Sequence, residues 1–130
     1  MADDFDKFVP KTDGEAQPDT VSKENPLKMG IVGHGFVGKA VEYAFHHHMI
    51  EHFLVDPNYD TNIDDLIKWD PSIVFICAPT PQNAKSGFVD ASIVEDAVLK
   101  LIYNTNAFVV VKSTVTPDII DRLYNSIEPE

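Results

Sequence analysis

The sequence predicts a doubly wound α/β fold, in which helices cover both faces of a parallel sheet of about four strands. Short apolar runs alternate with segments of helical periodicity along the chain, which is the pattern of repeated βα units. The apolar runs over residues 73–78 and 107–111 are continuous, and such runs are typical of parallel strands buried on both faces. A glycine-rich turn over residues 33–38 joins the first strand to the first helix.

The first strand is predicted over Lys28–Val32, and the glycine turn follows it at once. Gly33, Gly35 and Gly38 form the pattern G-x-G-x-x-G. The first glycine allows a tight turn, the second lets the main chain approach a diphosphate, and the third lets the helix pack closely on the sheet. Because the turn directs the free N–H groups of a helix start toward one point, it suits an anion. The alternative is a glycine turn that only packs a helix on a sheet.

The helix after the turn is predicted to run from Phe36 to about His47. Its apolar positions are Phe36, Val37, Ala40, Val41, Ala44 and Phe45. His34 stands between two glycines and so faces the predicted phosphates; it is either a hydrogen-bond donor to them or a merely exposed loop histidine. Consecutive residues such as His46, His47 and His48 point in directions about 100° apart on a helix and cannot share one ion, so no metal site is predicted.

The second strand is predicted over His52–Val55, and an acidic residue, Asp56, closes it. Asp56 lies at about the offset from the glycine turn that is expected for the carboxylate binding the ribose of a dinucleotide. A carboxylate accepts hydrogen bonds from two ribose hydroxyls but repels a 2′-phosphate, which favours NAD over NADP. The glycine turn and Asp56 together predict a Rossmann-like dinucleotide-binding domain.

A short helix and a third strand come next. The apolar positions of the helix are Ile63, Leu66 and Ile67, and Asn62, Asp64 and Asp65 surround its start. The third strand is predicted over Ile73–Ala78. It leaves through Pro79-Thr80-Pro81, a rigid exit at the carboxyl end of a strand, which is where ligands bind in such sheets.

The last part of the chain predicts a helix, a fourth strand and a final helix. Asp90 or Ser92 can cap the first of these helices. Its apolar face consists of Ile93, Val94, Ala97, Val98, Leu101 and Ile102. The fourth strand is predicted over Ala107–Val111 and ends in Lys112-Ser113-Thr114. Pro117 suits the first turn of the final helix.

Composition and charge bound the class of protein. With 130 residues, the chain is predicted to hold one domain over residues 27–130, preceded by a disordered acidic arm over residues 1–26. The formal net charge of −11 and the lack of a Lys/Arg cluster argue against nucleic acid as a partner. The apolar runs are only strand-length and the start lacks a signal peptide, so we expect no membrane partner and a cytoplasmic location. The single cysteine fits a reducing compartment.

Three segments in the same order resemble one family: GHGFVG at residues 33–38, FICAPTP at 75–81 and KSTVTP at 112–117. They are similar to the N-terminal cofactor domain of the UDP-glucose/GDP-mannose dehydrogenases, which oxidise the C6 alcohol of a nucleotide sugar to a carboxylate with NAD. The resemblance covers about residues 28–124.

The resemblance implies a role for each matching position. The glycine turn would hold the pyrophosphate, Asp56 the adenosine ribose, Thr80 and Pro81 the middle of the cofactor, and Ser113 and Thr114 the nicotinamide side. The candidate cofactor-binding residues are therefore Gly33, His34, Gly35, Phe36, Val37, Gly38, Asp56, Pro79, Thr80, Pro81, Ser113 and Thr114.

The sequence also departs from the family. Only 18 residues lie between Asp56 and Phe75, where the family has a longer segment with a further strand. The crossover must then run almost directly from the second strand to the far side of the first, which predicts the strand order 2-1-3-4. Asp118 stands where the family tends to have a glycine. The family's catalytic cysteine and lysine belong to a sugar-binding domain beyond Glu130, and Cys77, placed in a buried strand, is not predicted to replace that nucleophile. No catalytic residue is predicted.

Two functions follow as hypotheses. The chain is either the NAD-binding half of a nucleotide-sugar dehydrogenase or a non-enzymatic nucleotide-binding or assembly module derived from that fold. The polar groups of Asp56, Thr80 and Ser113 at strand ends favour the first, whereas the missing catalytic half favours the second. Besides the small dinucleotide, the alternatives for a partner are a separate sugar-binding chain and a second copy of the chain.

Overall fold

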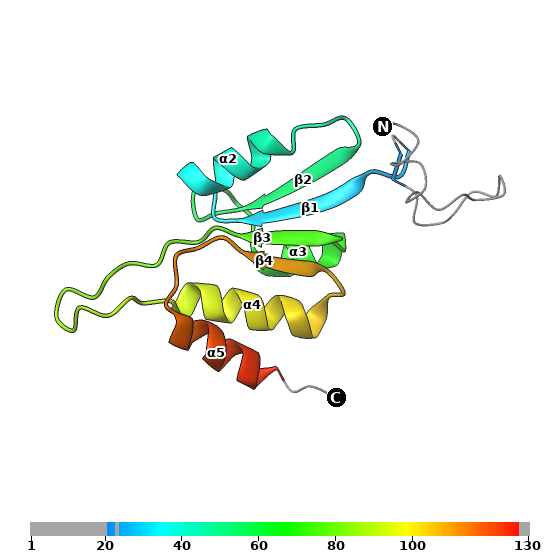
Figure 1. Ribbon diagram of the computed structural model, residues 1–130. Helices are drawn as coiled ribbons and strands as arrows, with labels where there is room; N and C mark the ends of the chain where they lie inside the picture. The colour runs from blue at the N-terminus through cyan, green and yellow to red at the C-terminus, as the bar shows by residue number, and fades with distance from the viewer. Residues whose placement is uncertain (1–20, 23, 128–130) are drawn as a thin grey trace, which may run out of the picture.

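The computed structural model describes residues 21–22 and 24–127, so most of the predicted acidic arm lies outside the described residues. Four parallel strands form one sheet: β1 (Leu27–Val32), β2 (Ile50–Val55), β3 (Ile73–Ile76) and β4 (Phe108–Val111). Their order is β2-β1-β3-β4, as the short crossover from the second strand predicted (Figure 1).

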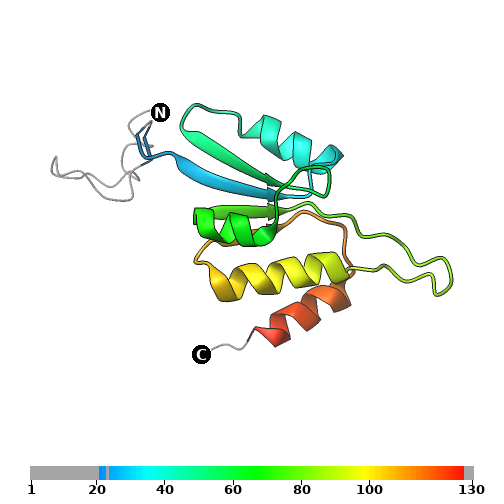
Figure 2. The same cartoon turned by 180° about the vertical axis from the view of Figure 1, so that it is seen from behind.

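Four helices cover the sheet unequally. α2 (Phe36–Ala44) lies on one face, while α3 (Ile63–Trp69) and α4 (Ser92–Asn104) lie on the other, with α5 (Pro117–Ser126) packed beside α4 (Figures 1 and 2). This division follows from the right-handedness of the crossover connections between parallel strands. The chain moves one way across the sheet from β1 to β2 and the opposite way from β2 to β3 and β4, so right-handed crossovers place α2 and the later helices on opposite faces.

The core is divided between the two faces. Leu66 and Leu101, fully buried, belong to the larger cluster beneath α3, α4 and α5. The smaller cluster under α2 contains Met29, Ile31, Val41 and Phe75. β3 is buried on both faces, as its continuous apolar run predicted.

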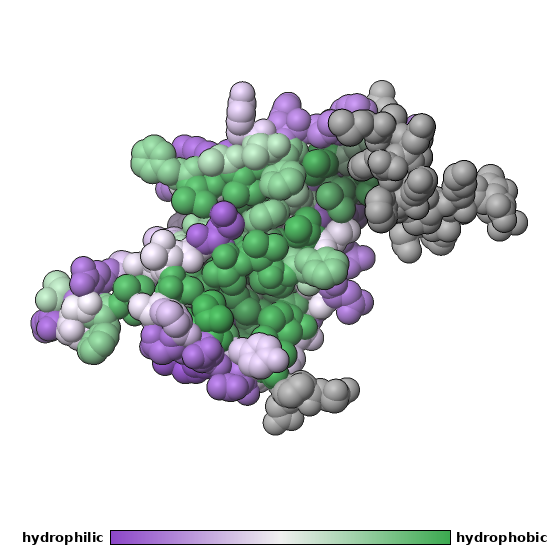
Figure 3. All heavy atoms as spheres, viewed as in Figure 1, coloured by the Kyte–Doolittle hydropathy of each residue, from purple (hydrophilic) through white to green (hydrophobic). Residues whose placement is uncertain are grey.

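The α2 side of β4 is uncovered, so the prediction that this strand is buried on both faces is wrong. β4 lies at the edge of the sheet, and α2 packs over β1 and β3. Phe108 is 79% exposed, and the three valines that follow are half-buried. Phe36, at the start of α2, is 97% exposed and borders a groove on this face. Figure 3 shows the resulting apolar area in the middle of this face.

Several element boundaries differ from the sequence prediction: β1 begins at Leu27, β2 at Ile50 and β4 at Phe108, and β3 ends at Ile76 instead of Ala78. α2 ends at Ala44 and not at His47, because the chain turns there: the N–H of His46 donates to the carbonyl of Tyr43, and that of Ile50 to the carbonyl of His47. Pairing at β3 reaches one residue beyond Ile76, since the N–H of Cys77 donates to the carbonyl of Val32 at 2.7 Å.

Within the described part of the chain, no helix is long and apolar enough to cross a bilayer.

Candidate functional site

A cleft of about 430 Å³ opens at the carboxyl ends of β1, β3 and β4. Its lining residues are Gly33, Gly35, Phe36, Val37, Asp56, Cys77, Ala78, Pro79, Thr80, Ser113 and Thr114. The three segments singled out in the sequence are thus brought together at one edge of the sheet. The predicted residues His34, Gly38 and Pro81 do not line this cleft.

The three glycines of the turn differ in the space around them. Gly33 has a φ of +92°, and a Cβ there would lie 2.6 Å from the carbonyl oxygen of Cys77. A Cβ on Gly38 would lie 2.0 Å from the carbonyl oxygen of Gly33. The helix α2 therefore approaches the turn more closely than a side chain at position 38 would permit. A Cβ on Gly35 would have no heavy atom within 4 Å. The packing of the protein therefore requires glycine at positions 33 and 38, whereas the surroundings of Gly35 are open space.

The first turn of α2 offers main-chain donors to the cleft. The first hydrogen bond into the helix runs from the N–H of Lys39 to the carbonyl of Gly35 at 2.9 Å. The N–H groups of Phe36, Val37 and Gly38 precede this bond and so lack helical partners. No side chain caps this end of the helix, and no acidic residue lies in its first turn. The end of α2 is therefore open to an anion.

Asp56 is held by the main chain on both sides of its carboxylate. Its Oδ2 accepts a hydrogen bond from the N–H of His34 at 2.7 Å, and its Oδ1 accepts one from the N–H of Asn58 at 2.9 Å. These bonds, first that from Asn58 and then that from His34, lower the pKa of Asp56 below its usual value. The side chain is thus fixed in orientation and ionised at neutral pH, at the border of the cleft.

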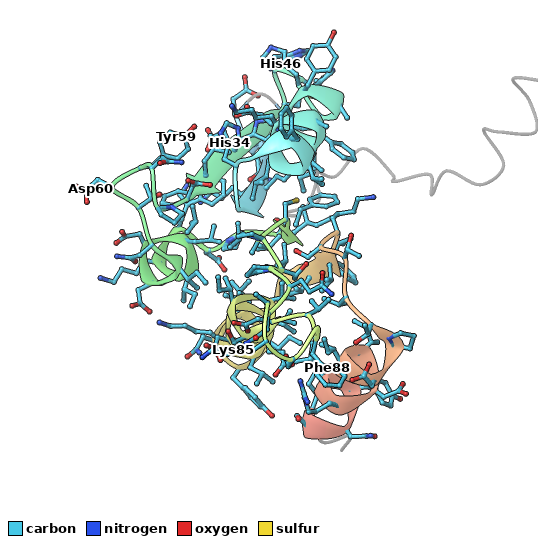
Figure 4. All side chains as sticks on the ribbon, turned by 90° about the vertical axis from the view of Figure 1, so that its left-hand side faces the viewer. His34, His46, Tyr59, Asp60, Lys85 and Phe88 are labelled. Carbon is cyan, nitrogen blue, oxygen red and sulfur yellow. The ribbon has the colours of Figure 1, made fainter. Side chains whose placement is uncertain are left out.

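A second cavity, of about 530 Å³, adjoins the cleft and shares Gly33, Asp56, Ala78 and Pro79 with it. Its remaining lining residues are Val32, Val55, Pro57, Asn58, Thr61, Asn62, Ile63 and Ile93. None of these residues was predicted from the sequence to belong to the site. The order of the elements could have indicated them, because the segment after β2 and the start of α4 both lie at the carboxyl edge of the sheet. This edge faces the viewer in Figure 4.

Hydrogen bonds to the main chain engage the hydroxyl groups at the ends of β3 and β4. Thr80 Oγ1 donates to the carbonyl of Thr114 at 2.8 Å, and Ser113 Oγ donates to the carbonyl of Ala78 at 2.7 Å. These bonds tie the two strand exits together. The hydroxyls therefore serve the fold itself, so their presence at strand ends does not by itself distinguish a cofactor site from a structural domain.

Cys77 differs from its predicted place inside a buried strand. It is half-buried and lines the cleft, because β3 gives way to the exit loop at this position. Burial raises the pKa of its thiol, and the positive charge of Lys112 only partly offsets this effect. The thiol form therefore dominates at neutral pH, which agrees with the inference that Cys77 is not an activated nucleophile.

His34 does not direct its ring toward the cleft, in contrast to the expectation that it faces the phosphates. The ring contacts Glu42 of α2 and Tyr59 of the loop after β2. Pro81 also lies away from the cleft, where its carbonyl accepts a hydrogen bond from the N–H of Asp90 at 2.8 Å. Among the described residues, no group of three His, Cys, Asp or Glu side chains could hold a metal ion.

The fold and this edge of the sheet define a class: a parallel α/β domain with a cleft at the carboxyl ends of its strands. No protein-family model, curated protein or solved structure matches the chain.

Proposed function

We propose that this domain binds NAD. The proposal rests on one observation above all: a cleft and an adjoining cavity meet at Asp56 and Gly33, beneath the uncapped end of α2. Each volume falls within the range of about 300–1,000 Å³ that is typical of small-molecule sites. An elongated ligand with an anionic centre and two ring systems fits this arrangement.

The chemistry of the two cavities suggests the direction in which NAD lies. The second cavity is bordered by the apolar side chains of Ile63 and Ile93 and by Pro57, which suit the faces of an adenine ring. The pyrophosphate would meet the free N–H groups of the glycine turn, and Asp56 would accept hydrogen bonds from the adenosine ribose. The nicotinamide half would then lie toward Thr80 and Thr114.

Asp56 provides the test of cofactor choice. We expect the protein to bind NAD more tightly than NADP, because the ionised carboxylate repels a 2′-phosphate and Pro57 and Asn58 supply no compensating positive charge. Asp56→Asn should weaken NAD binding about 10- to 100-fold, the scale of a lost charge-assisted hydrogen bond. Isothermal titration calorimetry with NAD, NADH and NADP measures both effects. Tighter binding of NADP by the unmodified protein would refute this cofactor assignment.

Gly35→Ala is expected to reduce NAD affinity while leaving the fold intact. The added methyl group meets no protein atom within 4 Å, and Gly35 lines the cleft. Overpacking by one methyl group typically costs about 1–3 kcal/mol, which corresponds to about 10- to 100-fold in affinity if the pyrophosphate needs that space. Thermal unfolding and NAD titration of the same sample separate the two effects. Unchanged affinity in a folded variant would show that no ligand approaches the turn there.

We further propose that the domain is the cofactor half of a nucleotide-sugar 6-dehydrogenase, on the strength of the three resembling segments. The second candidate is a non-enzymatic nucleotide-binding or assembly module. The internal hydrogen bonds of Thr80 and Ser113 favour this second candidate, because they give both hydroxyls a role without a cofactor. Calorimetry decides first: an absence of NAD and NADH binding would favour the assembly module.

A further inference from the structure

The ring of His34 joins three segments of the molecule. Its Nδ1 lies 2.7 Å from the hydroxyl oxygen of Tyr59, and its Nε2 lies 3.0 Å from Oε1 of Glu42. The side chain is only 8% exposed, although it belongs to a turn at the edge of the sheet. The rings of His34 and Tyr59 are 5.5 Å apart between centroids. Figure 4 shows the two side chains next to each other, with Asp60 farther out.

The chemistry of the two partners, Glu42 and Tyr59, assigns the hydrogens of the ring. A carboxylate only accepts hydrogen bonds, so Nε2 of His34 carries a hydrogen and donates it to Glu42. In the neutral imidazole, Nδ1 is then an acceptor and receives the hydroxyl hydrogen of Tyr59. Both ring nitrogens are satisfied within the protein. Through these two hydrogen bonds the ring links the glycine turn to α2 and to the loop after β2.

The main chain of the same residue holds the other end of that loop. The N–H of His34 donates to Oδ2 of Asp56 at 2.7 Å, and the carbonyl of Asp56 accepts from the N–H of Tyr59 at 2.9 Å. His34 thus contacts the loop at its first residue through the main chain and at Tyr59 through the ring. A loop fastened at two points loses less conformational freedom when a ligand binds.

We propose that His34 is a positioning residue for the adenosine half of the cofactor. Its ring fastens loop 56–61 to the glycine turn, and the fastened loop holds Asp56 and the wall of the adjoining cavity ready for the adenosine ribose and base. This inference rests on the proposed binding of NAD for its functional meaning, but the fastening itself is a property of the free protein.

The first experiment needs no ligand. Hydrogen exchange of loop 56–61 is followed in the unmodified protein and in the variants His34→Ala, Tyr59→Phe and His46→Ala. His46 is the control, because it is an exposed histidine whose ring lies away from this cluster, near the end of α2 (Figure 4). Exchange of the Asn58 and Tyr59 amides should become about tenfold faster in the first two variants and stay unchanged in the third. Unchanged exchange in His34→Ala would overturn the proposal.

The second experiment measures the consequence for binding. The affinities of His34→Ala for NAD and for AMP should both fall about five- to tenfold, the scale of one or two lost hydrogen bonds. Both should fall because both ligands contain the adenosine half that His34 is proposed to position. His34→Gln should recover part of the loss, since an amide both donates and accepts. A loss of NAD affinity with unchanged AMP affinity would instead assign His34 to the nicotinamide side and contradict the proposal.

The two proposals fail separately. If the unmodified protein binds neither NAD nor AMP, the proposed function fails, whereas the exchange experiment still decides whether His34 fastens the loop. If the unmodified protein binds NAD and folded His34→Ala binds it equally well, the cofactor assignment stands and the positioning role of His34 is wrong.

Discussion

Gly38→Ala is expected to destabilise the fold by about 3 kcal/mol or more, a large part of the stability of a domain of this size. Helix propensity alone predicts the opposite, because alanine in a helix is about 1 kcal/mol more favourable than glycine. The steric effect is larger here. The new Cβ would lie 2.0 Å from the main-chain carbonyl oxygen of Gly33, and that oxygen cannot rotate away as a flexible side chain could. α2 would have to separate from the turn.

Urea unfolding, followed by circular dichroism, measures this effect. Gly35→Ala is the matched control, since it makes the same chemical change three residues earlier, in open space. We expect the midpoint of Gly38→Ala to fall sharply and that of Gly35→Ala to change little. Equal stability of Gly38→Ala and the unmodified protein would mean that α2 does not pack closely against the carbonyl group of Gly33.

The sequence predicted those features that depend on local spacing or on chain length. The roles of Gly33 and Gly38 follow from their separation, because a tight turn and a closely packed helix need glycine at fixed positions. The strand order followed from the 18 residues between Asp56 and Phe75, which are too few for another strand and its connections. The meeting of Asp56, Thr80 and Ser113 at one edge followed from the parallel arrangement of the strands.

The remaining features depend on contacts that spacing does not encode. Helical periodicity shows which residues share a face but not whether another element covers it, so the exposure of Phe36 and Phe108 was not predictable. The ring of His34 meets Tyr59 across 25 positions of sequence, and no local pattern indicates that contact. Likewise, the hydroxyl of Ser113 could be predicted at a strand end, but its bond to the carbonyl of Ala78 could not.

This chain alone is expected to produce no NADH from UDP-glucose and NAD. Oxidation of an alcohol to an acid requires two hydride transfers and a base for the hydroxyl proton, and the family resembled here also holds the aldehyde on a cysteine. The described cleft offers little of this chemistry. Burial raises the pKa of Cys77, the single cysteine of the sequence, so its thiolate is scarce at neutral pH.

Three other polar groups in or beside the cleft are equally unsuited to the reaction. Thr80 and Ser113 donate their hydroxyl hydrogens to main-chain carbonyls, and Lys112 is exposed beside an apolar groove on the α2 face. Lys112 does not line the cleft, so it is not placed to take the hydroxyl proton of a substrate bound there. The absorbance of NADH should not rise above that of a control without protein. Sustained NADH production that disappears in Cys77→Ser or Lys112→Ala would show that this cleft is a complete active site.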